Sequence, residues 1–291
     1  MDSMALWYDK DIKIELDVNI FTSSTYSDYV EFGLKCCILS EIKTTETKLY
    51  EVYLYLPFHL AKRDIVNIPL SSDLELIGSM FNEDMEISIK KYTSVKYKKS
   101  NTAREFCIRN LYDFDVENTN GGSTIKIEVK HSMNECCNYY YRFRVKKLAA
   151  FVNSFNDNIP FVDWVFKKSK HLDFTVNKLD KLPNMIVDKM KHFESKIYKI
   201  NFFLITNDKL NLVSSNSHHN IKTASKIWKR HYLHDEKSKK SDNLIIYHYR
   251  EKDVFMKFQE IKHNTWLVLS VLFVIIITVV SSFIAIFGCF K

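Results

Sequence analysis

Glycine and proline are scarce in this chain of 291 residues, which contains 5 Gly and 4 Pro. A typical protein has about 12% of the two together, so collagen-like repeats, Gly-rich linkers and most phosphate-binding Gly loops are excluded. The sequence also lacks a P-loop, G-x-G-x-x-G, G-x-S-x-G and a paired C-x-x-C motif. We therefore expect no cofactor, and we do not expect the chemistry of the enzyme families that carry these motifs.

Features of secreted proteins are missing as well. The first residues, MDSMALWYDKDIKIELD, contain no apolar stretch of a signal peptide, and no asparagine begins an N-x-Ser/Thr sequon. The six cysteines include the vicinal pairs Cys36-Cys37 and Cys136-Cys137, which lie in strand-like apolar sequence. Such cysteines are typical of small, reduced, buried side chains rather than of a disulfide framework. We expect a reducing, cytoplasmic environment.

One long apolar run stands at the end of the chain. Residues Trp266 to Phe290 form 25 uncharged positions, and a membrane span needs about 20 helical residues. The run predicts a single transmembrane helix, with a buried core helix as the alternative. Basic residues near the run lie mainly on its N-terminal side, where Arg250, Lys252, Lys257 and Lys262 precede it, against Lys291 after it. This asymmetry predicts a C-terminal anchor, with residues 1–265 in the cytoplasm.

Small residues form a stripe within the predicted span. Thr278, Ser281, Ala285 and Cys289 recur at helical spacing, and Gly288 widens the stripe. Small residues let two membrane helices approach closely. The stripe favours a homo-oligomer formed through the anchor, with chance occurrence as the alternative.

Charge is unevenly divided along the chain. Residues 1–150 carry 20 basic and 22 acidic residues, whereas residues 151–265 carry 21 and 13. The basic half adjoins the predicted anchor, and anionic lipid attracts Lys and Arg. We therefore expect membrane lipid as a partner, with a merely solvated face as the alternative. The candidate headgroup contacts are Lys226, Lys229, Arg230, Lys237, Lys239 and Lys240.

A second basic stretch, from Lys90 to Arg104, interleaves lysines with tyrosines and contains no acid before Glu105. Such a pattern suits nucleic-acid phosphates or lipid headgroups, although a solvated strand is the commoner explanation. Because the predicted anchor holds the chain at a membrane, lipid is favoured over nucleic acid as the partner of this stretch. Nucleic acid is therefore an unlikely partner.

Alternating apolar residues in the first 150 positions predict strands. Ile12, Ile14, Leu16, Val18 and Ile20 alternate with polar residues, as in a strand with one buried face. Similar sequence patterns predict strands at Tyr29–Leu39, Leu49–Leu56, Met85–Ile89 and Glu105–Ile108. A three-strand meander is predicted from Tyr112–Val116, Ile125–Val129 and Tyr139–Val145, with Asn120-Gly121 at the first turn. On its polar face the first strand carries acids, and the third carries Arg142 and Arg144.

The sequence pattern changes after about residue 147. Short helices are predicted at Leu148–Phe155 and Pro160–Phe166. An amphipathic helix is predicted after Pro183 from Ile186, Met190, Phe193 and Ile197, and another at Ile221–Leu233 with Asn220 as its N-cap. Strands return at Ile200–Thr206 and Leu244–Tyr249, and residues 234–243 read as a loop.

The predicted fold class is α+β, with mostly antiparallel sheet in the N-terminal half, mixed helices and strands after it, and one C-terminal transmembrane helix. The predicted divisions are a β-rich cytosolic region 1–150, a basic membrane-proximal region 151–265 and the anchor 266–290. The first two form either two domains or one, since later strands can complete the earlier sheet.

Two constellations have the residue types of catalytic or metal sites. Asp115, Glu128 and Lys130 match a metal-dependent nuclease, in which acids on adjacent strands hold Mg²⁺; cross-strand charge pairing explains them equally well. His231, His234 and Asp235 suit a metal on one helical face. These histidines also border an apolar stripe, which accounts for them without a metal.

These patterns favour a tail-anchored, single-pass membrane protein. Its cytosolic domain would bind a protein or small ligand at the membrane surface, as an adaptor, sensor or tether. One alternative is an effector that clusters through its transmembrane helix and perturbs the bilayer. Another alternative is the metal-dependent nuclease.

Overall fold

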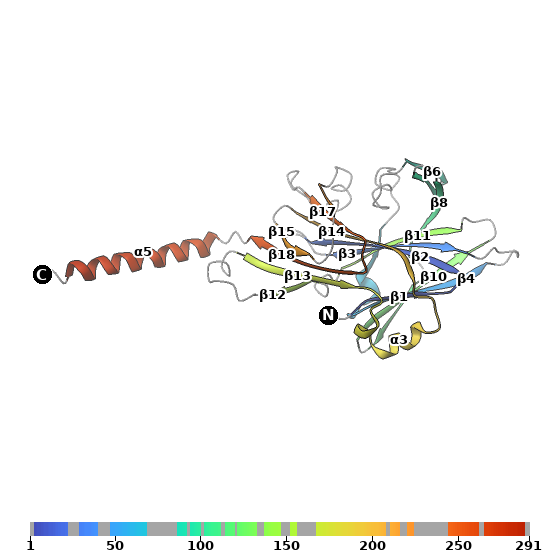
Figure 1. The fold of residues 1–291 in the computed structure, drawn as a ribbon, viewed down its shortest axis with the longest axis horizontal. Helices are drawn as coiled ribbons and strands as arrows, with labels where there is room; N and C mark the ends of the chain where they lie inside the picture. Colours follow the sequence, from blue (N-terminus) through green and yellow to red (C-terminus); the bar gives the residue numbers. More distant parts are fainter. Residues whose placement is uncertain are drawn as a thin grey trace.

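The computed structural model describes fifteen stretches of the chain. These are residues 3–22, 29–39, 47–68, 86–91, 94–99, 102–111, 114–119, 121–132, 137–146, 152–155, 167–207, 210–215, 220–223, 244–261 and 265–288. Within them the protein is mostly β, with three sheets and few helices (Figure 1). The predicted β-rich, largely antiparallel N-terminal half is confirmed.

The central sheet has ten strands, in the order β16-β17-β14-β2-β3-β11-β8-β7-β6, with β5 paired to β11. Two of its pairings, β14 with β2 and β11 with β8, are parallel, and the others are antiparallel. It draws strands from both sides of residue 150. Its members are β2 (Ile12–Thr22), β3 (Tyr29–Ile38), β5 (Ile65–Asn67), β6 (Glu86–Lys91), β7 (Ser94–Lys99), β8 (Thr102–Arg109), β11 (Asn138–Val145), β14 (Ile197–Asn207), β16 (Asn220–Thr223) and β17 (Leu244–Tyr249).

Two smaller sheets accompany it. The β4 sheet has the order β1-β4-β10-β9 and contains β1 (Ala5–Tyr8), β4 (Lys48–Leu56), β9 (Phe114–Thr119) and β10 (Gly122–His131). The β18 sheet has the order β12-β13-β18-β15 and contains β12 (Val152–Phe155), β13 (Lys167–Thr175), β15 (Leu210–Ser215) and β18 (Asp253–Ile261). All pairings in these two sheets are antiparallel.

One apolar core joins the three sheets. It includes Leu16 and Val18 from the central sheet, Leu54 from the β4 sheet, and Phe174 and Met256 from the β18 sheet. The rings of Phe174 and Phe202 lie 4.8 Å apart, which links β13 to β14. Burial of such large side chains is the main favourable contribution to folding.

The helical elements are short apart from the last one. They are the 3-10 turns η1 (Lys62–Asp64) and η3 (Leu179–Lys181), α3 (Asn184–Met190) and α5 (Thr265–Gly288). α3 packs Ile186 and Met190 on the outer face of the β4 sheet, against Trp7 and Tyr55. The helix predicted after Pro183 is confirmed but is shorter than expected. It ends at Met190, so Phe193 lies beyond it, and Ile197 begins β14.

α5 follows β18 after three residues and projects away from the sheets (Figure 1). Its described side chains are those of Leu269, Ser270 and residues 272–282. Among the described residues, no helix is long and apolar enough to cross a membrane.

The strand predictions are largely confirmed, but β2 is not half-buried. Asp17 and Asn19 were expected to face water, yet both are buried. The reason is position: β2 lies inside the central sheet between β14 and β3.

The predicted three-strand meander is wrong in its third strand. β9 and β10 form the expected hairpin, but β11 leaves it and pairs with β3 in the central sheet. There Tyr139 and Phe143 enter the common core. Arg142 is buried on the opposite face rather than exposed beside the acids of β9.

Two predicted helices contain strands instead. Val152–Phe155 is β12, which pairs with β13, and Asn220–Thr223 is β16, which pairs with β17. In both places a neighbouring strand satisfies the backbone, and tertiary pairing overrides local helix propensity. The remaining residues of those two helices, the helix at Pro160–Phe166 and the loop 234–243 lie outside the described residues.

β1 is held on both edges although it has only one neighbouring strand. β4 pairs with one edge, and single bridges to Val176 and Glu194 flank the other. Between these bridges the Asn177 amide takes the place of a peptide unit. Its Oδ1 accepts a hydrogen bond from Leu6 N at 2.7 Å, and its Nδ2 donates to Leu6 O at 3.0 Å and to Ser195 O at 2.7 Å. Asn177 adopts a positive φ of 56°, which Asn tolerates better than most residues.

We predict that Asn177→Asp lowers the free energy of unfolding by about 2–4 kcal/mol, because a carboxylate cannot donate to the carbonyls of Leu6 and Ser195. Urea unfolding of the detergent-solubilised full-length protein, followed by circular dichroism, measures the loss. Asn177→Gly is the matched control for the backbone, since it keeps the positive φ without adding charge. Native-like stability of both variants would contradict the role of the amide.

Candidate functional site

The face of the central sheet that points away from the common core carries a buried polar cluster. In one row across the strands, Asn201 of β14 lies beside Asp17 of β2, which lies opposite Gly33 of β3, which in turn lies opposite Arg142 of β11. The next row along contains Asn19, Glu31 and Arg144. Four neighbouring strands therefore bring together charged and polar residues that are far apart in the sequence.

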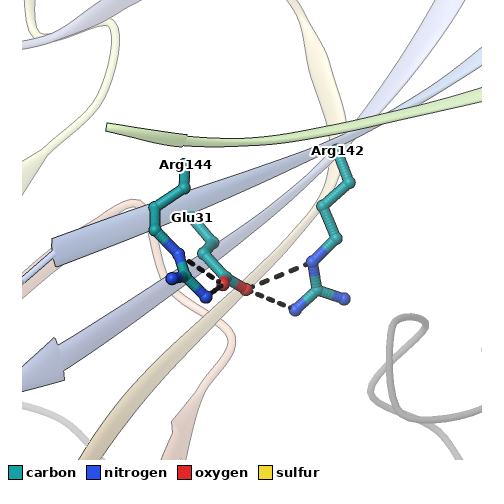
Figure 2. Close-up of polar contacts among 3 residues, drawn as sticks. All are labelled: Glu31, Arg142 and Arg144. Carbon is teal, nitrogen blue, oxygen red and sulfur yellow. Dashed lines mark hydrogen bonds and ion pairs between the residues drawn. The ribbon is translucent and has the colours of Figure 1, made fainter. Parts of the chain in front are cut away.

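Glu31 is clamped between two arginines (Figure 2). Its Oε2 accepts hydrogen bonds from Arg142 Nη2 at 2.6 Å and Nε at 3.2 Å. Its Oε1 accepts from Arg144 Nη2 at 2.8 Å and Nε at 3.1 Å. The Glu31 side chain is fully buried, whereas those of Arg142 and Arg144 are 2% and 16% exposed. The Arg144 guanidinium also lies 3.8 Å from the centre of the Tyr29 ring, within cation–π distance.

Asp17 and Lys35 form a second buried ion pair in the same cluster. Lys35 Nζ lies 3.1 Å from Asp17 Oδ2, and Asn201 Nδ2 donates to Asp17 Oδ1 at 2.6 Å. Burial by itself lowers the pKa of Lys35, but the charge of Asp17 raises it, and the net shift is upward. Lys35 is therefore a fixed cation rather than a proton donor at neutral pH.

Tyr140 of β11 occupies the space above Gly33. A Cβ placed at Gly33 would lie 2.5 Å from the Tyr140 hydroxyl, so only glycine leaves room for this ring. Burial raises the pKa of Tyr140 to about 12; the charges of Asp17 and Glu31 also raise it, whereas those of Arg142 and Lys35 lower it. The tyrosine is protonated at any physiological pH.

The arrangement of this cluster suits structure better than catalysis. Each buried carboxylate is met by a base at hydrogen-bond distance, and each pair joins different strands. Breaking such a pair is strongly destabilising because it leaves a buried charge uncompensated. The cluster therefore fixes the register of β14, β2, β3 and β11.

Sequence reasoning missed this cluster because it placed the polar side of β2 and the arginines of β11 in water. A usable signal was present. Glu31 interrupts the apolar sequence of β3, and Arg142 and Arg144 are two residues apart, as expected of two bases that meet one acid across a strand pair.

The nuclease-like residues lie elsewhere, on the outer face of the β4 sheet. Asp115 is opposite Lys126, and Glu128 is opposite Glu51. Lys126 Nζ lies 2.5 Å from Glu51 Oε1 and 4.0 Å from Glu128 Oε1, so a lysine occupies the centre of these acids. Lys130 is exposed and lies opposite Leu49.

Glu51 is the acid that sequence reasoning did not consider. It accepts hydrogen bonds from Lys126 and, at 2.5 Å, from the Tyr53 hydroxyl, and these lower its pKa below the ordinary value. In the described residues, no group of three or more His, Cys, Asp or Glu is placed to hold a metal ion. Asp115 thus lies across the strand pair from Lys126, whereas Glu128 lies across from another acid and is near Lys126 on its own strand.

The other predicted site residues are only partly described. His231, His234 and Asp235 lie outside the described residues, as do the headgroup candidates Lys226, Lys229, Arg230, Lys237, Lys239 and Lys240. Cys289 lies outside them too. Trp266, Ala285 and Gly288 fall within the bounds of α5.

Thr278 and Ser281 are exposed on α5. The Thr278 hydroxyl donates to Val274 O at 2.8 Å, and the Ser282 hydroxyl donates to Thr278 O at 2.8 Å. These bonds satisfy the hydroxyls within the helix, as a polar side chain in an apolar environment requires.

Comparison of the sequence with models of known protein families and with curated proteins finds no match.

We predict that Glu31→Gln lowers the free energy of unfolding by about 3–5 kcal/mol, because two guanidinium groups lose their buried counter-charge. Asp11→Asn is the matched control: Asp11 pairs with Lys48 at 2.9 Å, but the two side chains are 52% and 48% exposed. The exposed pair should contribute less than about 1 kcal/mol. Urea unfolding measures both, and equal losses would contradict the structural role of Glu31.

Tyr140 should make stability fall at alkaline pH. Its pKa in the folded protein is about 12, above the ordinary value of 10.0, so the folded state keeps a proton that the unfolded state loses. The Tyr140 contribution is therefore complete below pH 10 and is lost as the pH rises from 10 towards 12.

We predict that Tyr140→Phe reduces this alkaline loss. It should not abolish it, because burial also raises the pKa of Tyr247 and Tyr249. Unfolding free energies measured across that pH range test the slope, with Tyr198→Phe at a 47% exposed position as the control. An unchanged slope in Tyr140→Phe would contradict the prediction.

Proposed function

We propose that this chain is a tail-anchored, single-pass membrane protein whose β-rich domain binds a protein or small ligand at the membrane surface. In this proposal residues 266–290 are the anchor and residues 1–265 lie in the cytoplasm. The domain acts as an adaptor, sensor or tether rather than as an enzyme of a motif-bearing family.

The observation that carries the proposal is the apolar surface of α5. Every described side chain from Leu272 to Val280 is exposed, and the large apolar ones are 48–64% exposed. Successive residues of a helix point about 100° apart, so these side chains surround the axis. A helix that is apolar all round is found inside a large protein or inside a membrane. The uncharged run of 25 residues supports the second of these environments.

The arrangement of the three sheets supports binding as the role of the domain. Its central sheet is locked by buried ion pairs, which give a rigid scaffold. Loops and outer sheet faces can present recognition groups from such a scaffold.

The acids of the β4 sheet surround Lys126. A nuclease site at Asp115, Glu128 and Lys130 would have to displace that lysine before two acids were open to a metal.

We predict that Ile276→Lys together with Val279→Lys releases the full-length protein from membranes. A lysine in the centre of a membrane helix costs about 3 kcal/mol in insertion experiments. Flotation of the protein with phosphatidylcholine vesicles measures the association. Leu39→Lys with Leu49→Lys is the matched control, since these leucines lie outside α5 and are 50% and 53% exposed.

Two further readouts of the same vesicles separate the alternatives. Dye leakage that depends on the small-residue stripe at Thr278 and Ser281 would favour the bilayer-perturbing effector. Flotation of the Ile276→Lys/Val279→Lys protein at the native level would contradict the anchor. In cells, protease added from outside should leave the domain uncut, because the domain is proposed to face the cytoplasm.

A further inference from the structure

The path of the chain places one end of the β18 sheet next to α5. β18 ends at Ile261 and α5 begins at Thr265. Four peptide steps can separate these two residues by at most about 14 Å. Whatever surface α5 enters, the Ile261 end of the β18 sheet must stay close to it (Figure 1).

The strand register identifies the residues at that end. Lys167 of β13 is paired with Ile261, Lys168 with Glu260, and Lys170 with Phe258. One step further, His171 is paired with Lys257. On the other side of β18, the segment of β15 that pairs with this end, Leu210–Ser214, contains no charged residue. A strand rises about 3.4 Å per residue, so the three lysines of β13 lie within roughly 10 Å of the Ile261 rung.

Charge is polarised along this sheet. The half of the β13–β18 ladder nearer α5 contains four lysines, Lys167, Lys168, Lys170 and Lys257, and one acid, Glu260. The half further from α5 contains Asp173 and Asp253, and these acids lie 3.7 Å from Lys181 and 4.0 Å from Lys178. The apolar alternation of β13, which supplies Leu172 and Phe174 to the core, begins only after these lysines. The basic residues thus lie at the end of the ladder nearer α5, and the apolar residues of β13 lie at the other end.

We propose that this basic ladder end, defined by Lys167, Lys168, Lys170 and Lys257, docks on the anionic lipid headgroups around the anchor. The inference rests on the proposed anchoring by α5. Two observations select anionic lipid as the occupant. The connection from β18 to α5 is short, and the positive charge of these lysines is opposite to that of the headgroups. The opposite half of the ladder, where Asp173 and Asp253 pair with Lys181 and Lys178, then faces away from the bilayer.

Tethering makes a modest attraction sufficient. Each Lys or Arg near an anionic surface contributes about 1 kcal/mol, which decays within a Debye length of roughly 8 Å at physiological salt. The anchor keeps the ladder end at high effective concentration near the headgroups. Docking therefore needs only a few bases, provided that they are at this end of the domain.

The test uses the full chain with a protease recognition sequence inserted after Ile261, reconstituted into vesicles. Phosphatidylcholine vesicles are compared with vesicles that also contain phosphatidylserine. Flotation before cleavage reports the anchor alone and should succeed with both lipids. After cleavage, the domain should stay on the phosphatidylserine vesicles at low salt, leave them at high salt, and leave the neutral vesicles at any salt.

Lys167→Glu, Lys168→Glu and Lys170→Glu combined should weaken retention after cleavage on the order of 100-fold, the product of roughly fivefold for each of three bases. The matched control reverses three exposed bases outside the β18 sheet, at Lys10, Arg63 and Lys130, and should change retention little. Flotation of the uncleaved chain should be unaffected in both triple variants.

The outcomes separate the two proposals. Failure of the uncleaved protein to float would overturn the anchor, and with it this inference. Normal flotation followed by equal release from both kinds of vesicle would overturn the docking alone. Equal weakening by the two triple variants would also overturn it, because it would show that total charge rather than the ladder end matters.

Discussion

The structure depends on the neutralisation of charge inside the central sheet. β2 and β3 are covered on both faces, yet one face carries Asp17, Glu31 and Lys35. An isolated buried charge is far more costly than any single apolar contact is favourable. The strands on either side must therefore supply counter-charges at fixed positions. β11 does so with Arg142 and Arg144, and β14 adds the Asn201 amide.

This requirement explains why β11 departs from the hairpin that precedes it. As the third strand of a local meander, β11 would satisfy its backbone but leave Glu31 without a partner. In the central sheet it instead places two guanidinium groups on one carboxylate and four aromatic or aliphatic side chains in the core. The gain in long-range pairing outweighs the simpler local connection. Gly33 completes the arrangement by leaving space for Tyr140.

Much of the secondary structure was predictable, because alternation of apolar residues reports strands whichever sheet they join. β2, β3, β4, β14 and β17 follow from such patterns. The sheet to which a strand belongs did not follow, since β11 has the same alternation in either sheet. Val152–Phe155 and Asn220–Thr223 were misread as helix because four residues carry too little periodicity to oppose a neighbouring strand. The buried cluster was missed for a related reason: a polar alternation looks alike on a half-buried strand and on a central one.

The position of β18 gives the proposed anchor a mechanical logic. β18 is an interior strand of its sheet, paired along its length with β13 and at five residues with β15. A force transmitted from α5 to β18 would load the hydrogen bonds of both ladders, whereas the same force on an edge strand would be carried by one ladder. Phe174 and Met256 tie these strands to the common core. The proposed tether would thus join the domain at a strand held by two ladders, and the basic ladder end lies at that same junction.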